Sequence, residues 1–219
     1  MTRISILIAL LLGCAAWSGR AEAQLNRGTM RFSIDGDVLS VGGVKLDYPG
    51  PGESKATVVG FGPNQIGNAR AHGAGPTPIG IGFGYVLTPK LILGVRGALG
   101  YDVVAPDGAR NNTRVLGLAL MPGITFVPLG HKAKLAINAA PIFQVDRAKT
   151  EGDPKARTLL GGFALGVGAL IFVHSKLSAD VGFQFEGRFG NRDDNETNDD
   201  NVHIRDLRGL IRLGVSFWR

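Results

Sequence analysis

The chain has 219 residues, of which 33 are glycine, and a formal net charge of +6. This length fits a single all-β domain. Because the basic residues are scattered rather than gathered in a Lys/Arg run, the composition argues against a nucleic-acid-binding protein. The glycine content and the frequent turn residues argue against a helix-rich fold.

The N-terminal segment has the three parts of a secretory signal peptide. A basic residue precedes an apolar stretch that starts at Ile4, and the small-x-small triplet AEA ends at Ala23. Cleavage there removes residues 1–23 and leaves a mature domain of residues 24–219 that begins with Gln24. Alternatively, the sequence LLGC resembles a bacterial lipobox, with Cys14 as a lipidated N-terminus.

The sequence after the signal excludes several kinds of site and span. Cleavage at Ala23 removes the only cysteine, so the mature chain has no disulfide and no cysteine-ligated zinc. No later apolar run reaches the roughly 18 residues that a spanning helix needs. If the mature chain crosses a membrane, it must do so as a β-barrel.

Period-2 alternation of apolar and polar residues predicts eight long strands. In chain order they are approximately Thr29–Val41, Pro78–Leu87, Leu91–Val104, Thr113–Val127, Ala133–Ala148, Arg157–Val173, Leu177–Gly190 and Val202–Trp218. The stretch LSADVGFQFEGRFG shows the pattern most clearly, because its odd positions are apolar or glycine and its even positions hold every polar and charged residue.

Short and long connections alternate between these strands. Three connections are tight turns of a few residues, near positions 89, 130 and 175. The longer, polar connections are Gly42–Thr77, Ala105–Asn112, Lys149–Ala156 and Asn191–Asn201. In the first of them, Ala56–Phe61 has strand character and is expected in a hairpin above the membrane, while ten-stranded variants stay open. Short periplasmic turns and longer external loops are typical of outer-membrane barrels.

The two faces of the strands favour a membrane barrel over a soluble one. The less apolar face consists largely of Gly and Ala on several strands, which suits the narrow lumen of an eight-stranded barrel better than a water-exposed surface. The apolar face has no charge through the middle of the strands, as hydrocarbon requires. The sequence therefore predicts an all-β, closed, antiparallel transmembrane barrel with a small and polar lumen. A soluble periplasmic ligand-binding barrel is the alternative.

The predicted lumen face carries six basic and seven acidic residues. They are Arg31, Asp35, Asp37, Arg96, Asp102, Lys134, Asp146, Asp180, Glu186, Arg188, Asp206, Arg208 and Arg212. Buried charges are tolerated when they are paired and hydrogen-bonded, so this balanced set predicts ion-pair networks between strands. Such networks would act either as a structural plug or as a narrow, gated conduit.

These residues resemble the small outer-membrane β-barrel proteins of the OmpA/OmpX type, including the Ail-like surface adhesins. The unit PIGIGFGYVLTPKLILGVRGALGY (Pro78–Tyr101) resembles a strand–turn–strand unit of that group, and LIRLGVSFWR resembles its terminal strand. The terminal strand there commonly ends in an aromatic residue, whereas here Arg219 follows Phe217 and Trp218. The resemblance implies an outer-membrane location in a Gram-negative-type bacterium and contact with outer-membrane lipids and the barrel-assembly machinery.

No residue pattern points to catalysis, a cofactor or a metal. The histidines His72, His131, His174 and His203 lie in predicted loops, turns or a strand start, and no two have metal-ligand spacing. An outer-membrane enzyme would need His72 or His203 beside a serine or carboxylate at the rim. We therefore expect a structural or surface-interaction role, with a possible surface ligand at the external loops and a small-solute channel as the alternative.

Overall fold

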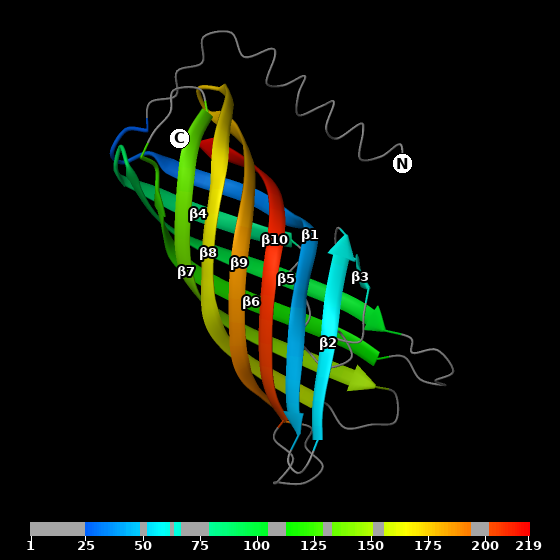
Figure 1. The fold of residues 1–219 in the computed structure, drawn as a ribbon. Coiled ribbons are helices and arrows are strands. Elements are labelled where there is room, and N and C mark those ends of the chain that lie inside the picture. The colour runs from blue at the N-terminus through cyan, green and yellow to red at the C-terminus, as the bar shows by residue number, and fades with distance from the viewer. Residues whose placement is uncertain are drawn as a thin grey trace, which may run out of the picture.

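The computed structural model describes residues 25–48, 52–61, 64–66, 79–104, 113–128, 133–150, 156–193 and 202–219. These residues form one antiparallel sheet of ten strands (Figure 1). The strands are β1 (Met30–Tyr48), β2 (Gly52–Phe61), β3 (Asn64–Ile66), β4 (Ile79–Thr88), β5 (Leu91–Val104), β6 (Thr113–Phe126), β7 (Ala133–Thr150), β8 (Ala156–His174), β9 (Leu177–Asp193) and β10 (Val202–Trp218). No helix long and apolar enough to cross a membrane occurs in the described part of the chain.

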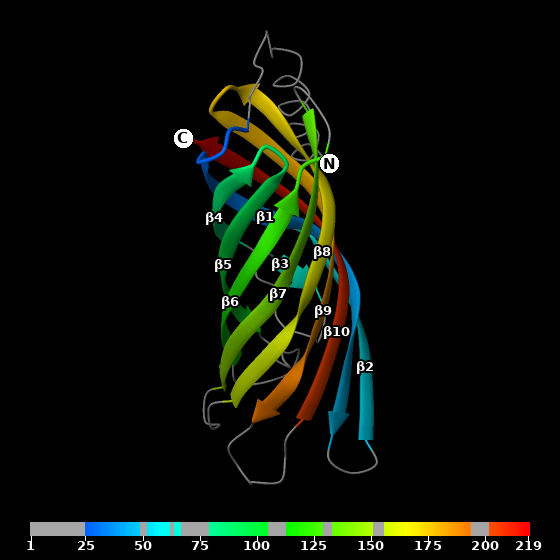
Figure 2. The same ribbon diagram turned by 90° about the vertical axis from the view of Figure 1, so that its left-hand side faces the viewer.

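Eight of the strands close into a ring. Neighbours follow the chain from β4 to β10, and β1 completes the ring by pairing with both β4 and β10. The β1–β10 seam is long, running from Arg31 opposite Trp218 to Asp47 opposite His203. All eight predicted strands are present, and closure of the ring gives each of them a partner on both edges, as strands that cross a membrane require. Figure 2 shows how strongly the strands tilt across the elongated barrel.

The first strand continues beyond the point where the sequence predicted its end. The expected loop from Gly42 to Thr77 is wrong at its start, because β1 continues to Tyr48 and turns back into β2. Two strands pair with successive parts of the same edge of β1. β4 pairs with Met30–Gly36, and β2 pairs with Leu39–Tyr48. The predicted hairpin therefore exists, and it extends the barrel wall at the long-loop end.

A register shift in β1 changes which of its residues face the lumen. The β1–β10 pairing skips a residue between Asp37 and Leu39. Asp37 is buried before this bulge, whereas Ser40 and Val44 are buried after it, so the inward parity changes from odd to even. Bulges commonly re-aim side chains in this way. A prediction that keeps the same parity along the whole strand therefore assigns the residues after the bulge to the wrong face.

The apolar face of the strands points outward. On β6, Leu118 is 58% exposed, whereas its neighbour Ala119 is 1% exposed. On β9 the outward positions from Leu177 to Phe189 are all uncharged, and at a rise of about 3.3 Å per residue and a tilt of about 40° they span a height of about 30 Å. That matches the hydrocarbon core of a bilayer. A soluble barrel with its apolar face inside is therefore excluded.

The two ends of the barrel differ. The tight turns β4–β5 and β8–β9 lie at one end, where the backbones of Met30 and Arg219 exchange hydrogen bonds of 2.7 and 2.9 Å. We call this the turn end. The paired ends of β1 and β2, and the strand ends that border the longer connections, lie at the other, the long-loop end (Figure 1).

Candidate functional site: the charged lumen

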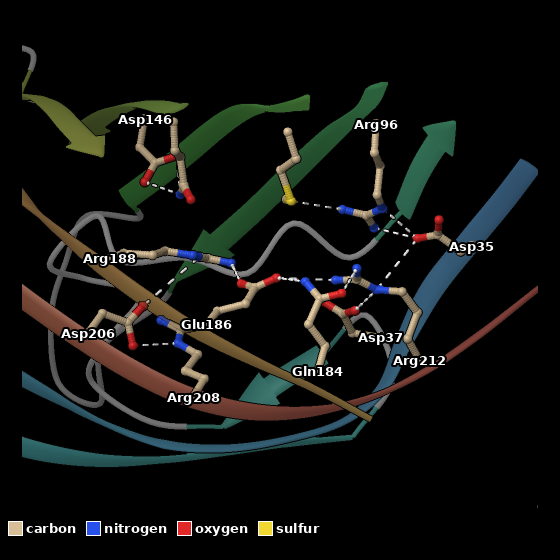
Figure 3. A network of polar contacts seen from close by, with 12 residues as sticks. Asp35, Asp37, Arg96, Asp146, Gln184, Glu186, Arg188, Asp206, Arg208 and Arg212 are labelled. Atoms are coloured by element: carbon tan, nitrogen blue, oxygen red, sulfur yellow. Dashed lines mark hydrogen bonds and ion pairs between the residues drawn. The ribbon is translucent and has the colours of Figure 1, made fainter. Parts of the chain in front are cut away.

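A continuous network of charged side chains crosses the lumen (Figure 3). Strand parity places all of its members on the inner face. Three neighbouring strands, β1, β9 and β10, supply all but one of them, and β5, which β4 separates from β1, supplies the other. The members are Asp35 and Asp37 of β1, Arg96 of β5, Gln184, Glu186 and Arg188 of β9, and Asp206, Arg208 and Arg212 of β10. We call this set the charged layer.

Arg212 is the hub of the charged layer. Its Nε donates to Asp37 Oδ1 at 2.8 Å and lies 3.6 Å from Asp35 Oδ1. Its Nη1 donates to Gln184 Oε1 at 2.8 Å, and its Nη2 lies 3.3 Å from Glu186 Oε1. Because a guanidinium carries five donors in a fixed plane, one arginine can join two strands in this way.

The layer extends from the hub in both directions. On one side the Nε of Arg96 donates to Asp35 Oδ1 at 2.7 Å, so a single carboxylate faces two guanidinium groups (Figure 3). On the other side Glu186 pairs with Arg188. The contacts continue to Asp206, which lies 4.0 Å from Arg188, and from Asp206 to Arg208, whose Nε donates to Asp206 Oδ1 at 2.7 Å.

Burial makes the pairing essential. Glu186 and Asp206 are 0% exposed, and Arg188 and Arg208 are 1% exposed. Desolvation of a charge costs several kcal/mol unless partners and hydrogen bonds replace the lost water. The alternation of acid and base along the layer supplies those partners. The charged layer therefore fills its part of the lumen with ion pairs, and an apolar cluster of Ala98, Ala119, Met121, Ile142 and Ala164 on β5 to β8 fills the lumen beside it.

Glycines on the neighbouring strands make room for these large side chains. A Cβ at Gly80 would overlap the guanidinium of Arg96, and one at Gly117 would lie 2.6 Å from Asp146 Oδ1. Asp146 is itself buried and accepts from Gln144 Nε2 at 2.7 and 2.9 Å. The Gly- and Ala-rich inner face expected from the sequence thus has a specific use.

A second polar cluster lies nearer the turn end. Arg31 Nη2 pairs with Asp180 Oδ2 at 2.7 Å, and its Nε donates to Ser216 at 2.9 Å. Ser178 accepts from the indole of Trp218 at 3.0 Å and donates to Asp180 at 2.8 Å. The Arg31 guanidinium also lies 5.5 Å from the centre of the Trp218 ring, within the range of a cation–π contact.

A cavity of about 180 Å³ lies between the two polar sets. Arg31 and Asp180 line it on one side and Asp35, Arg96 and Arg212 on the other, and the rest of its wall combines glycine and alanine with larger apolar residues such as Ile92, Met121 and Leu170. Its volume and these five charged side chains suit a few water molecules. The cavity is therefore a chamber of mixed polar and apolar lining between two ion-paired clusters.

Apolar clusters lie beyond the polar sets at both ends of the lumen. The cluster at the turn end is Leu25, Val86, Ile92, Val127, Ala136, Leu170, Phe172 and Trp218. The cluster at the long-loop end is Val44, Leu46, Leu160, Val202 and Ile204. Along its axis the described barrel therefore alternates between apolar, polar and apolar layers.

The charges predicted for the lumen fall into several groups. Arg31 and Asp180 form the second cluster, Asp146 pairs with Gln144, and most of the others form the charged layer. Lys134 has the inward parity of Ala136 on β7. For Asp102 the structure describes the strand but not the side chain, and Cys14, Ala23 and Gln24 lie outside the described residues.

The prediction of lumen residues considered only charged side chains, so it missed the uncharged members of these networks. Gln184 and Gln144 have the same parity as the charged residues and could have been found from alternation alone. Ser178, Ser216 and Trp218 share the face of Asp180 or Arg212. Selecting only charged residues excluded them, although amides and hydroxyls hydrogen-bond to buried charges as well.

The histidine expected at the rim lies on the outer surface. His203 is exposed on β10, opposite Asp47, and its Nδ1 lies 2.6 Å from Asn191 Oδ1. His72 and His131 are outside the described residues. The absence of catalysis, of a cofactor and of a metal site stays a prediction from the sequence.

Comparison with known proteins identifies the fold. No protein-family model matches the sequence, and no curated protein sequence matches it. Among solved structures, the outer membrane protein OprG from Pseudomonas aeruginosa aligns with a TM-score of 0.50 at 10% identity, covering 89% of this chain and 98% of that one. The chain has the fold of an outer-membrane β-barrel.

Two smaller proteins of known structure also align. Neisserial surface protein A has a TM-score of 0.44 at 13% identity, with 87% of this chain and 99% of that one covered. The N-terminal barrel domain of OprF from Pseudomonas aeruginosa has a TM-score of 0.43 at 13% identity, with coverages of 88% and 98%. The closed ring of eight strands and the alignment with OprG confirm the predicted barrel fold.

Proposed function

We propose that this barrel does not conduct and serves as a rigid membrane-embedded support that presents its long loops at the cell surface. The observation that carries this proposal is the charged layer, in which connected ion pairs and hydrogen bonds occupy the lumen between two apolar clusters, beside the buried apolar cluster of β5 to β8. Its role would be membrane integrity or surface contact through the first and last external loops.

The energetics of the charged layer favour a permanent plug. Passage of an ion would require Arg212 to leave its contacts with Asp37 and Glu186. Separating buried partners costs about 3–5 kcal/mol when the charge left behind has no replacement. Several contacts would have to break together, because the hub joins β1, β9 and β10.

Single-channel recording in planar lipid bilayers tests the proposal. We expect the wild-type protein to give no steady conductance and an Arg96→Ala, Arg212→Ala double variant to give openings, because that variant removes two large side chains from the layer. The matched control is Arg205→Ala, which removes an arginine from the outer surface. Steady conductance in the wild type that the double variant alters would contradict the plug.

That contrary result would support the second candidate, a narrow conduit for ions or small solutes. The cavity of about 180 Å³ favours it, since the charged side chains of Arg31, Arg96 and Arg212 line this space inside the barrel. A conduit would need the Arg31–Asp180 pair and the Arg212 hub to move in turn. Conductance that also changes in an Arg31→Gln variant would distinguish this candidate from leakage at the apolar ends.

Assembly is expected to depend on the last strand. We propose that the barrel-assembly machinery recognises β10, whose outward side chains end in Phe217. Phe217→Ser should then lower the amount of folded protein in the outer membrane without changing refolding in detergent. Equal reduction in both assays would indicate a general loss of stability instead.

A further inference from the structure

Four basic side chains form a patch on the outer surface at the long-loop end. Arg114 lies on β6, Arg147 and Lys149 on β7, and Arg157 on β8, and all four are exposed. The register places Arg114 opposite Lys149 and Arg147 opposite Arg157. Directly opposite residues have Cβ atoms about 4.5–5.5 Å apart, a separation at which like charges destabilise a sheet. We call these four residues the cationic patch.

Within the described residues the patch has few acidic neighbours to offset this repulsion. The outer faces of β6, β7 and β8 carry no acidic side chain there, and the nearest one on β9 is Asp193, opposite Arg157. In that part of the chain no hydrogen bond or ion pair joins the patch to another side chain. On the described strands, four positive charges therefore face one acidic side chain.

Basic residues elsewhere at the same end are arranged differently. Lys45 and Arg205 lie opposite each other on β1 and β10, but Asp47 sits between them, 3.0 Å from Lys45 Nζ and 4.0 Å from Arg205 Nε. Lys45 and Arg205 therefore share an acidic partner, Asp47, on the same surface. The cationic patch, by contrast, is complementary to an external anion.

The position of the patch indicates what that anion is. On the same outer face, the residue two positions after each of these arginines is apolar. Leu116 stands two positions after Arg114 and Leu159 two positions after Arg157, and both leucines are about half exposed. The patch therefore marks the border of the lipid-facing belt, at the height where lipid headgroups lie. A phosphate there could accept from opposed guanidinium groups while the acyl chains run along the leucines.

We propose that the cationic patch binds the phosphate groups of an anionic lipid in the leaflet at the long-loop end. Arg147 and Arg157 would hold one phosphate, and Arg114 and Lys149 a second. A lipid with two phosphates on one headgroup fits this arrangement better than one with a single phosphate. The inference is independent of whether the lumen conducts.

Native mass spectrometry of the full-length protein in neutral detergent tests the site, with bis-phosphorylated lipid A as the probe and dephosphorylated lipid A as the reference. The test variant is Arg147→Gln, Arg157→Gln. The matched control is Lys45→Gln, Arg205→Gln, which removes the same number of basic residues from the outer surface at the same end. We expect the test variant to bind about 25-fold more weakly, roughly fivefold for each cation removed, and the control to bind like the wild type.

A heat-dependent shift in gel mobility establishes that each variant is folded. If the first test variant does not fold, Arg114→Gln, Lys149→Gln serves in its place, because it removes the other opposed pair. Equal binding by wild type and folded test variant would overturn the proposal. So would equal binding of the phosphorylated and dephosphorylated lipids, or an equal loss in the control variant.

Discussion

The inner and outer faces of the same strands follow opposite rules about charge. On β9, Glu186 and Arg188 are buried in the lumen and paired, whereas Phe185 and Phe189 alternate with them and point into lipid. Backbone geometry is the same for both sets. The lumen accepts charges because partners from other strands lie within hydrogen-bond distance, and hydrocarbon supplies no such partner. Position relative to the barrel wall therefore decides whether a charge stabilises or disrupts.

Removing one charge from the inner face should have the largest effect. Glu186→Ala removes the closest carboxylate of the buried Arg188 and one of the carboxylates around Arg212, so we expect a loss of about 3–5 kcal/mol in the free energy of unfolding. Urea-induced unfolding in lipid vesicles measures it. Phe185→Leu, which keeps an apolar residue on the outer face, should cost no more than about 1 kcal/mol. A similar small loss for Glu186→Ala would show that water screens the charged layer.

Adding one charge to the outer face should rank next. Leu118→Arg places a guanidinium in the apolar belt, where a basic residue costs about 2–4 kcal/mol. Leu118→Met is the control, since it keeps the side chain apolar and of similar size. The same unfolding assay applies. Unchanged stability of Leu118→Arg would contradict the assignment of this face to lipid.

A pair of glycines tests the packing difference between the faces. Gly80→Val on the inner face overlaps the Arg96 guanidinium and should cost about 1–3 kcal/mol. Gly97 faces outward with no atom within 4 Å of the position of an added Cβ, so Gly97→Val should be tolerated. If the two substitutions cost the same, the loss reflects the strand backbone rather than crowding in the lumen.

The smallest effect concerns an ion pair beyond the membrane. The hydrogen bond from Lys45, together with the charges of Lys45, Arg205 and His203, lowers the pKa of Asp47 below its ordinary value of 3.8. A lowered folded-state pKa means that the stabilisation is present above pH 3.8 and is lost as the pH falls through the folded-state value. NMR titration of the Asp47 carboxyl carbon measures this midpoint.

The control for this titration is a pair of single substitutions. Lys45→Gln should raise the midpoint of Asp47 toward 3.8, and Arg205→Gln should raise it less, because Arg205 lies 4.0 Å away and Lys45 3.0 Å. An unchanged midpoint in Lys45→Gln would mean that solvent screens the pair completely.

Sequence alone determined the two-faced strands, their number and the alternation of short and long connections. These features are local, because a side chain's face depends only on parity along its strand and a turn depends on a few adjacent residues. The outward face was also predictable from composition, since Gly and Ala opposite a charge-free apolar face fit only a narrow lumen in a membrane.

Tertiary structure decided which charges pair. Arg212 joins residues that lie 175 and 28 positions away in the chain, at Asp37 and Gln184, and no local pattern records that proximity. Register between strands sets it, and the bulge after Asp37 shifts the register of β1 by one residue. The continuation of β1 to Tyr48 has the same origin, because it depends on the partners that β10 and β2 offer. Parity is a property of one strand, whereas pairing is a property of the closed ring.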